Sequence, residues 1–257
     1  MIDQWEKGAK YWDKAWNPVI GCEKVSEGCA NCYAASMATR FPELQDADGG
    51  FTPHAPTCQK RPPKTGVVFV GNMTDLFGEW NTDQEIIDWT FEMYPLAANL
   101  LLTKRAERMA RLAPRMASLD FAATFYGITA ENQQRFDERV KPLLDVKDEL
   151  HWWLSAEPLL ESIDLGKWMQ FEHPDNEGYG VPIVEFFDWV VVGAESGPNR
   201  RPCKIEWVEE IVDTCESWNV PVFVKQLDID GKLVTDINKF PEHLQIRQVP
   251  WMERAGR

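Results

Sequence analysis

Three cysteines fall within eleven residues of the sequence, in the stretch GCEKVSEGCANCYA. Cys22, Cys29 and Cys32 follow the spacing C-x6-C-x2-C. Zinc would need a fourth ligand, which Cys58 or His54 in the next loop could supply. An iron–sulfur cluster held by three thiolates would leave one iron open for a substrate or cofactor. The spacing alone fits both metals.

The elements around the three cysteines favour the cluster. They fall between a predicted strand, AWNPVIG (residues 15–21), and a predicted helix, AASMATRF (residues 34–41). Zinc knuckles usually pair two cysteine hooks on hairpins instead. A loop after the first strand of a β/α barrel would place its ligands at the mouth of the barrel. We therefore predict an iron–sulfur cluster held by these three thiolates.

The rest of the chain alternates between apolar, β-rich segments and amphipathic segments with helix signals. This pattern predicts a parallel sheet, either open and doubly wound or closed into a complete or partial barrel. In both, chemistry sits where the strands end. The β-rich segments are residues 66–75, 99–105, 121–132, 151–160, 188–197 and 220–226.

Polar residues follow the predicted strands and are candidates for a site. Any one of them could instead cap a helix or lie in a solvated loop. A basic run, LLTKRAERMARLAPR, begins at one strand end and continues into the next predicted helix. The candidates at the strand ends are Asn72, Asp75, Lys104, Arg105, Glu131, Asn132, Glu157, Glu195, Lys225 and Gln226.

Length and composition allow one α/β domain. The chain has 257 residues, of which 44% are hydrophobic, so it can bury a large core. We expect a single domain over residues 1–257, with an irregular loop at 42–65 and a possible lid at 158–187, which is too long and too rich in Gly and Pro for a simple connection.

Charge and cysteine content bear on partners and compartment. The formal net charge of −14 argues against a protein that coats nucleic acid nonspecifically. The six cysteines do not resemble the disulfide framework of a short secreted chain. No apolar run is long enough for a membrane span, and the N-terminus lacks the layout of a signal peptide. We therefore expect a cytoplasmic protein that does not associate with membranes.

Seven motifs in order carry a family resemblance. Radical S-adenosylmethionine enzymes bind a 4Fe-4S cluster through three cysteines after the first strand, usually spaced CxxxCxxC. This chain is similar to a bacteriophage-encoded, radical-SAM-like family with the wider C-x6-C-x2-C spacing. The resemblance covers residues 16–226 and implies a partial (β/α) barrel of six to seven parallel strands. The motifs are WNPVIGCEKVSEGCANCYA, FVGNMTDLF, LLTKR, GITAEN, SAEPLL, DWVVVGAESG and VFVKQ.

The resemblance also implies an activity. Better understood members of the phage family isomerise 5-Nα-glycinylthymidine to 5-Cα-glycinylthymidine during thymidine hypermodification of viral DNA. The implied cofactors are the 4Fe-4S cluster and S-adenosylmethionine. The implied partners are a modified thymidine, in DNA or as its nucleotide, and an electron donor such as flavodoxin or ferredoxin, in the host cell cytoplasm if the protein is phage-encoded.

Two alternatives stay open. The same chemistry could act on another nucleic-acid substrate, such as a DNA lesion. The chain could also be a non-catalytic, zinc-stabilised protein that contacts nucleic acid through the basic run at residues 104–115. A Cys58→Ser change should cost metal and fold only on the zinc hypothesis.

Roles at the cofactor follow from position in the series of strand ends. Tyr33 follows the last thiolate and could pack on the cluster or cofactor. Related enzymes bind the methionine amino group of the cofactor after the second strand, which suggests Asn72 and Asp75. The remaining cofactor candidates are Thr129, Glu131 and Asn132 near the ribose hydroxyls, and Gly193 and Glu195 near adenine.

Four further residues are candidates for acting on the substrate. Lys104 and Arg105 could hold a substrate carboxylate or a DNA phosphate. Glu157 and Lys225 face the same presumed cavity and could act on the glycine amine or carboxylate. The sequence does not assign one group to either of them.

Overall fold

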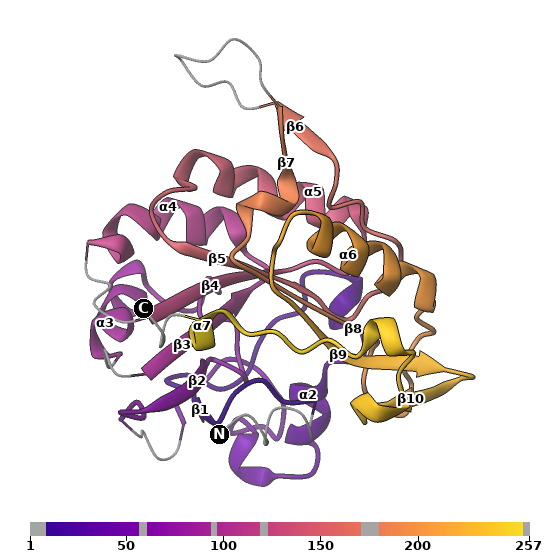
Figure 1. Cartoon of the computed structure of the whole chain (residues 1–257). Helices are drawn as coiled ribbons and strands as arrows, with labels where there is room; N and C mark the ends of the chain where they lie inside the picture. Colours follow the sequence, from indigo (N-terminus) through magenta and orange to yellow (C-terminus); the bar gives the residue numbers. More distant parts are fainter. Residues whose placement is uncertain (1–8, 57–60, 94–96, 119–122, 171–179, 254–257) are drawn as a thin grey trace.

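The computed structural model describes residues 9–56, 61–93, 97–118, 123–170 and 180–253. Its centre is an eight-stranded sheet whose neighbouring strands follow one another along the chain (Figure 1). All neighbouring pairs are parallel except the last, β9 with β10. The strands in order are β1 (Lys14–Trp16), β2 (Gly66–Val70), β3 (Ala97–Thr103), β4 (Ala123–Thr129), β5 (His151–Ala156), β8 (Trp189–Gly193), β9 (Val222–Ile229) and β10 (Lys232–Val234).

The predicted fold class, α/β with a mostly parallel sheet, is confirmed, and seven of the eight strands run parallel. A doubly wound sheet reverses its strand order part-way across. This sheet keeps a single order from β1 to β10. The doubly wound alternative is therefore wrong.

Helices follow the strands where the sequence predicts them, and local signals explain their starts. In α3, the Thr82 hydroxyl accepts a hydrogen bond from the Glu85 N–H, and the Glu85 carboxylate accepts one from the Thr82 N–H. Asn132 caps α5 by accepting from the Arg135 N–H at 2.9 Å. The α-helices are α2 (Tyr33–Ala38), α3 (Asp83–Glu92), α4 (Ala106–Ala117), α5 (Gln133–Val140), α6 (Ile205–Ser217) and α7 (Pro250–Glu253). Among the described residues, none of these helices has the length and apolar character needed to cross a membrane.

Short 3-10 helices complete the connections. They are η1 (Glu27–Cys29), η2 (Pro42–Leu44), η3 (Lys141–Val146), η4 (Ile183–Phe186), η5 (Ile237–Lys239) and η6 (Glu242–Leu244).

The sheet divides the apolar residues into two cores because successive side chains of a strand point to opposite faces. Leu101 lies in the larger cluster, together with buried residues of α3, α4, α5 and α6. Its neighbour Leu100 lies in the smaller cluster, which takes its buried residues from strands and from the two ends of the described chain. The strand-to-helix connections thus cover one face, as a sequential parallel sheet requires.

The other face is concave and is filled by aromatic rings. Tyr11, just before β1, lies 6.4 Å from Phe69 of β2 and 5.5 Å from Phe223 of β9, measured between ring centroids. In a flat sheet β2 and β9 would be about 24 Å apart, since strands are spaced about 4.8 Å. One tyrosine can reach both only because the sheet is strongly curved.

Two irregular segments were predicted. In the first, 42–65, the backbone of His54 pairs with Ile20, and residues 57–60 lie outside the described part. In the second, 158–187, the strands β6 (Trp168–Gln170) and β7 (Gly180–Pro182) form a ribbon that projects from the body (Figure 1). Its base contacts the helix face: Lys167 pairs with Asp137 of α5 at 2.9 Å. The proposed lid stays a prediction, because residues 171–179 lie outside the described part.

Candidate active site

The cysteine loop, residues 21–32, connects β1 to α2. Gly21 begins it with a φ of +91°, and a Cβ there would come within 1.9 Å of the Thr52 carbonyl oxygen, so the position requires glycine. The Cys22 N–H donates to the Phe51 carbonyl at 3.2 Å. The loop then forms η1 and ends at Cys32, which occupies the N-cap position of α2 without a capping hydrogen bond from its thiol. The contacts with residues 51 and 52 at the start of the loop, and the helix at its end, therefore fix where the cysteines lie.

The three cysteines line one cavity of about 150 Å³, called here the thiol cavity. Among the described residues, no three Cys, His, Asp or Glu side chains come close enough together to hold a single metal ion. His54 turns its Nδ1 to the Thr52 carbonyl oxygen at 2.8 Å, and Cys58 lies outside the described part. The described residues thus bring the three thiols to one cavity without forming a closed zinc site.

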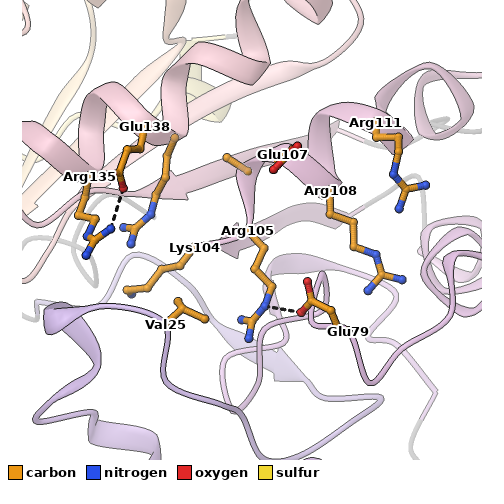
Figure 2. Close-up of a pocket in the computed structure, with 11 residues that line it drawn as sticks. Val25, Glu79, Lys104, Arg105, Glu107, Arg108, Arg111, Arg135 and Glu138 are labelled. Carbon is orange, nitrogen blue, oxygen red and sulfur yellow. Dashed lines mark hydrogen bonds and ion pairs between the residues drawn. The ribbon is translucent and has the colours of Figure 1, made fainter.

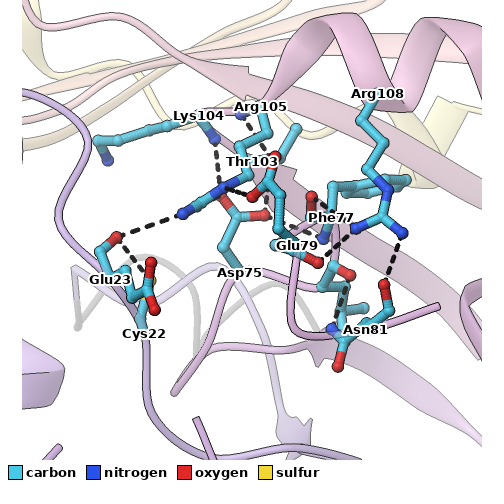
Figure 3. A network of polar contacts seen from close by, with 12 residues as sticks. Cys22, Glu23, Asp75, Phe77, Glu79, Asn81, Thr103, Lys104, Arg105 and Arg108 are labelled. Atoms are coloured by element: carbon cyan, nitrogen blue, oxygen red, sulfur yellow. Dashed lines mark hydrogen bonds and ion pairs between the residues drawn. The ribbon is translucent and has the colours of Figure 1, made fainter. Parts of the chain in front are cut away.

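A first buried ion pair holds the start of the loop (Figure 3). Asp75 accepts from Arg105 Nη1 at 3.0 Å, from the Thr103 hydroxyl at 2.6 Å and from the Lys104 N–H at 3.1 Å. Arg105 Nη2 in turn reaches the Glu23 carbonyl in the cysteine loop at 3.5 Å. The pair thereby joins the ends of β2 and β3 to the residue after Cys22.

A second buried pair lies beneath the middle of the loop. Arg139 Nη1 donates to Glu131 at 2.6 Å and to the Thr129 carbonyl at 2.7 Å. The Gly28 N–H donates to the other Glu131 oxygen at 3.3 Å, and a Cβ at position 28 would lie 2.9 Å from the Glu131 carboxyl carbon. Burial by itself raises the pKa of Glu131, but the hydrogen bonds and charge of Arg139 outweigh it and leave the pKa lowered.

A third pair holds the end of the loop. Arg201 Nε donates to Glu195 at 3.0 Å, and Arg201 Nη1 donates to the Glu27 carbonyl at 2.9 Å. Asn31 Nδ2 donates to the same carboxylate at 2.9 Å. Burial raises the pKa of Glu195, yet the hydrogen bonds from Arg201 and Asn31 lower it overall. The end of β8 is thus tied to the segment that carries Cys29 and Cys32.

A fourth, more exposed contact joins η1 to α5. Asn132 Nδ2 donates to the Glu27 carboxylate at 2.5 Å, and Arg135 Nη2 donates to it at 3.0 Å. The pKa of Glu27 falls to about 2, first because its own backbone N–H donates to the carboxylate and then because of Arg135.

These contacts change the interpretation of four predicted residues. Asp75, Glu131, Asn132 and Glu195 were predicted to touch the cofactor through its amino group, ribose or adenine. In the structure their polar groups hold the cysteine loop, either directly or through arginine partners. Asp75 also lines the thiol cavity and Glu195 the concave pocket, so the predicted contacts with a cofactor stay predictions beside this positioning role.

The thiols of Cys22 and Cys29 differ in acidity. Burial, followed by the charge of Asp75, raises the pKa of Cys22 to about 12. Burial also acts to raise the pKa of Cys29, but the Lys104 ammonium and hydrogen bonds from residues 25 and 26 bring it below its ordinary value. Among the described residues, Lys104 has no ion-pair partner. Its free charge is thus available at the cavity wall.

A larger pocket of about 600 Å³ adjoins the thiol cavity and is called here the concave pocket. Its aromatic walls include Tyr11 and Trp12, and Glu157 and Lys225 lie at the strand ends that border it. It shares lining residues with the thiol cavity, among them Cys32, Tyr33, Lys104 and Thr129. A molecule in the concave pocket would therefore be adjacent to the thiols.

Tyr33 and Asn72 lie where a cofactor contact was predicted. Tyr33 is 45% exposed, although its hydroxyl donates to the Asn72 carbonyl, and its ring lines both cavities. The Asn72 side-chain oxygen accepts from Asn17 at 2.8 Å. Gly193 differs, because it lines neither cavity and a Cβ there would lie 3.3 Å from Gln226 Cγ. Its small size serves the close approach of β8 and β9, and the predicted contact with adenine stays a prediction.

The basic run lines a third hollow, a groove of about 740 Å³ between α4 and α5 (Figure 2). Arg108 and Arg111 both pair with Asp83 at the start of α3, at 2.8 and 2.6 Å. Arg115 donates to a neighbouring glutamine of α3 at 3.2 Å. The guanidinium groups of Arg108, Arg111 and Arg115 thus join α4 to α3. Lys104, at the end of β3, makes no such contact among the described residues.

Comparison with protein families gives one match. A family model, DUF5131, described as a protein of unknown function, matches residues 6–240. The chain belongs to the DUF5131 family. No curated protein and no solved structure matches it. The DUF5131 match spans the cysteine loop, the three ion pairs that hold it and both strand ends at Glu157 and Lys225.

Sequence reasoning missed the residues that complete this site. Arg139 and Arg201 were not singled out, although each lies within eight residues of the carboxylate it pairs with. Tyr11 and Trp12 were also missed, because they precede the first strand and belong to no periodic pattern. A signal for the arginines was available in the sequence. In both cases a glutamate at a strand end is followed, within eight residues, by the arginine that pairs with it.

Proposed function

We propose that this protein is a radical S-adenosylmethionine enzyme that binds a 4Fe-4S cluster through Cys22, Cys29 and Cys32. The observation that carries the proposal is the meeting of three thiols from one loop in a cavity that adjoins a pocket of about 600 Å³. The strand order and strong curvature support the partial (β/α) barrel that such an enzyme requires. As the resemblance implies, we infer the isomerisation of 5-Nα-glycinylthymidine to 5-Cα-glycinylthymidine.

The ligand types at the thiol cavity suit a cluster held by three thiolates. The described residues that line it include Cys22, Cys29 and Cys32, and none of them is a histidine. A single tetrahedral zinc ion would need a fourth ligand, which Cys58 or His54 would have to supply. Three ion pairs, two of them buried, fix the loop, as a cofactor with a set geometry needs.

The chain's own residues would bind and shield the reactants. When bound, the cluster and S-adenosylmethionine would supply the one-electron chemistry that removes a hydrogen atom from the substrate. Tyr11, Trp12 and Phe69 give the concave pocket apolar walls that exclude water. Lys104 stands at the junction of the two cavities and can hold an anionic group there. The isomerisation balances without added atoms: the bond between the thymine methylene and nitrogen breaks, a bond from the methylene to the α-carbon forms, and the hydrogen lost by the α-carbon is replaced by one gained at nitrogen.

Anaerobic reconstitution tests the cofactor. The expected result is iron and sulfide near four per chain and an electron paramagnetic resonance signal of the reduced protein that changes when S-adenosylmethionine is added. Cys29→Ala should abolish the signal, while Cys215→Ala, a change in the buried core of α6, should keep it. About one zinc per chain and no reconstituted cluster would contradict the proposal and favour the zinc-stabilised alternative.

The substrate is tested separately, on reconstituted protein. Incubation with 5-Nα-glycinylthymidine nucleotide should give a product of unchanged mass with a new carbon–carbon bond, detected by nuclear magnetic resonance of substrate labelled at the glycine α-carbon. A cluster that responds to S-adenosylmethionine without this product would favour another nucleic-acid substrate, such as a DNA lesion.

A further inference from the structure

One ion pair differs from the three that hold the cysteine loop. Lys225 Nζ of β9 lies 2.5 Å from Glu157 Oε1 at the end of β5, and both side chains line the concave pocket. Their side chains are 17% and 15% exposed, so the pair is mostly withdrawn from water but still reachable from the pocket. Apolar residues in the same positions would often stabilise a fold at least as well as a withdrawn ion pair. Stability of the fold therefore does not by itself explain why a charged pair lies at this position.

Both members of the pair keep unused bonding capacity. An ammonium group has three donors, and the hydrogen bond that Lys225 Nζ makes within the described residues goes to Glu157. Its other neighbours are the rings of Tyr11 at 5.8 Å and Trp12 at 6.0 Å. On Glu157, both Lys225 and Gln226 donate to Oε1, and no described residue donates to Oε2. A ligand could thus add a contact to each member without breaking the pair.

The pair is also placed away from the thiols. Glu157 and Lys225 line the concave pocket but not the thiol cavity, whereas Lys104 and Tyr33 line both. A cation and an anion that lie side by side, each with a free site, match a ligand that carries the opposite charges side by side. An α-amino acid group, with its ammonium next to its carboxylate, has this arrangement.

We propose that Lys225 and Glu157 form a recognition site for the zwitterionic amino-acid group of the substrate, with Lys225 binding the carboxylate and Glu157 binding the ammonium. The identity of the substrate rests on the proposed function, since a glycinyl group carries this zwitterion. Recognition of the zwitterion itself rests only on the pair and its pocket.

Binding measurements without turnover test this inference. Calorimetric titration compares N-benzylglycine, a zwitterion on a plain aromatic ring, with its methyl ester and its N-acetyl derivative, and repeats the comparison with 5-Nα-glycinylthymidine and its ester. Wild-type protein should bind each zwitterion about tenfold or more tighter than the blocked forms, as expected for a lost hydrogen bond to a charged group. Equal affinity for zwitterions and blocked forms overturns the proposal without any variant.

Matched variants assign the two charges. Lys225→Met should reduce the affinity for the zwitterion to that for the methyl ester and leave the affinity for the ester unchanged. Glu157→Gln should reduce the affinity for the zwitterion to that for the N-acetyl form and leave the affinity for the N-acetyl form unchanged. Lys10→Met, which removes another lysine of the same pocket, should change neither ratio. The double variant Lys225→Glu with Glu157→Lys keeps a pair for folding and should still bind the zwitterion more tightly than either single variant. Equal losses in Lys10→Met and Lys225→Met would show a general charge effect and overturn the assignment.

The outcomes separate this inference from the proposed function. Selective zwitterion binding by a protein that cannot assemble a cluster would remove the radical mechanism and keep the recognition site. A functional cluster in a protein that shows no preference for the zwitterion would keep the radical mechanism and remove the recognition site.

Discussion

Two sets of charged residues border the same cavities, and they differ in how completely their bonding capacity is used. Beneath the cysteine loop, Glu131 is fully buried and accepts from Arg139 and the Gly28 N–H. In the concave pocket, Lys104 has no ion-pair partner among the described residues, and the Glu157–Lys225 pair has free sites. The first set positions the backbone of the loop, and the second keeps unused donors and acceptors at the pocket wall. Bonding capacity, more than residue type, distinguishes the two roles.

The largest effect should come from opening a pair of the first set. Arg139→Ala leaves the Glu131 carboxylate buried without its counter-ion, which should lower the free energy of unfolding by about 3–5 kcal/mol. Urea unfolding followed by tryptophan fluorescence measures it. Arg111→Ala removes a 58% exposed guanidinium and should change the unfolding midpoint far less. Similar shifts in both variants would contradict the special role of the buried Glu131–Arg139 pair beneath the loop.

Gly28→Ala should have the next largest effect and sharpen the comparison without changing a charge. The new methyl would lie 2.9 Å from the Glu131 carboxyl carbon and must displace either the carboxylate or η1, at about 1–3 kcal/mol. Iron content after reconstitution should fall as the loop shifts. Gly166→Ala, whose methyl would find its nearest neighbour at 3.4 Å, serves as the control and should reconstitute like wild type.

A smaller effect concerns pH. Because the folded pKa of Glu195 is lowered, its ionised form stabilises the fold above the unfolded value of about 4.3, and this contribution is lost as pH falls through the folded pKa. The difference in unfolding free energy between wild type and Glu195→Gln should be constant from pH 7 to about 5 and shrink at more acid pH. Urea unfolding at several pH values measures it. A constant difference down to pH 3 would show that Arg201 does not favour the ionised carboxylate.

The smallest effect tests the free charge of Lys104. Lys104→Met should raise the pKa of Cys29, because the ammonium lowers it in the wild type. Alkylation by iodoacetamide, in cluster-free protein with Cys22 and Cys32 changed to alanine, should become slower near pH 7. Lys239→Met, which removes a 71% exposed lysine of η5 that pairs with Asp236, should leave the rate unchanged. An unchanged rate in Lys104→Met would mean that its charge does not act on this thiol.

The sheet could be predicted from the sequence because its strands are nearly continuous apolar runs. GVVFV and WVVVG, for example, correspond to β2 and β8, and a capping box marks the start of α3. The loop with the three cysteines also lies where the order of elements places it. These features depend on short stretches of chain, which a single sequence displays.

The partners of the charged residues could not be predicted in the same way. Glu131, Glu195 and Glu157 all follow strands, and all were candidates for contact with a ligand. Two of them pair with arginines that hold the cysteine loop, and one pairs with a lysine in a pocket. The partner of each carboxylate depends on the curvature of the sheet and on the path of the loop. Neither can be predicted from the residues next to the carboxylate in the sequence.

The position of Tyr11 has a consequence for synthesis of the chain. Its ring packs against Trp153, Trp189 and Phe223 as well as Phe69, so it contacts strands from both halves of the sequence. A ribosome makes Tyr11 long before it makes Phe223. The concave core therefore cannot close until the chain up to Phe223 has emerged, and the strands made earlier must wait with their aromatic faces uncovered. Cells that make this protein have reason to protect those faces during translation.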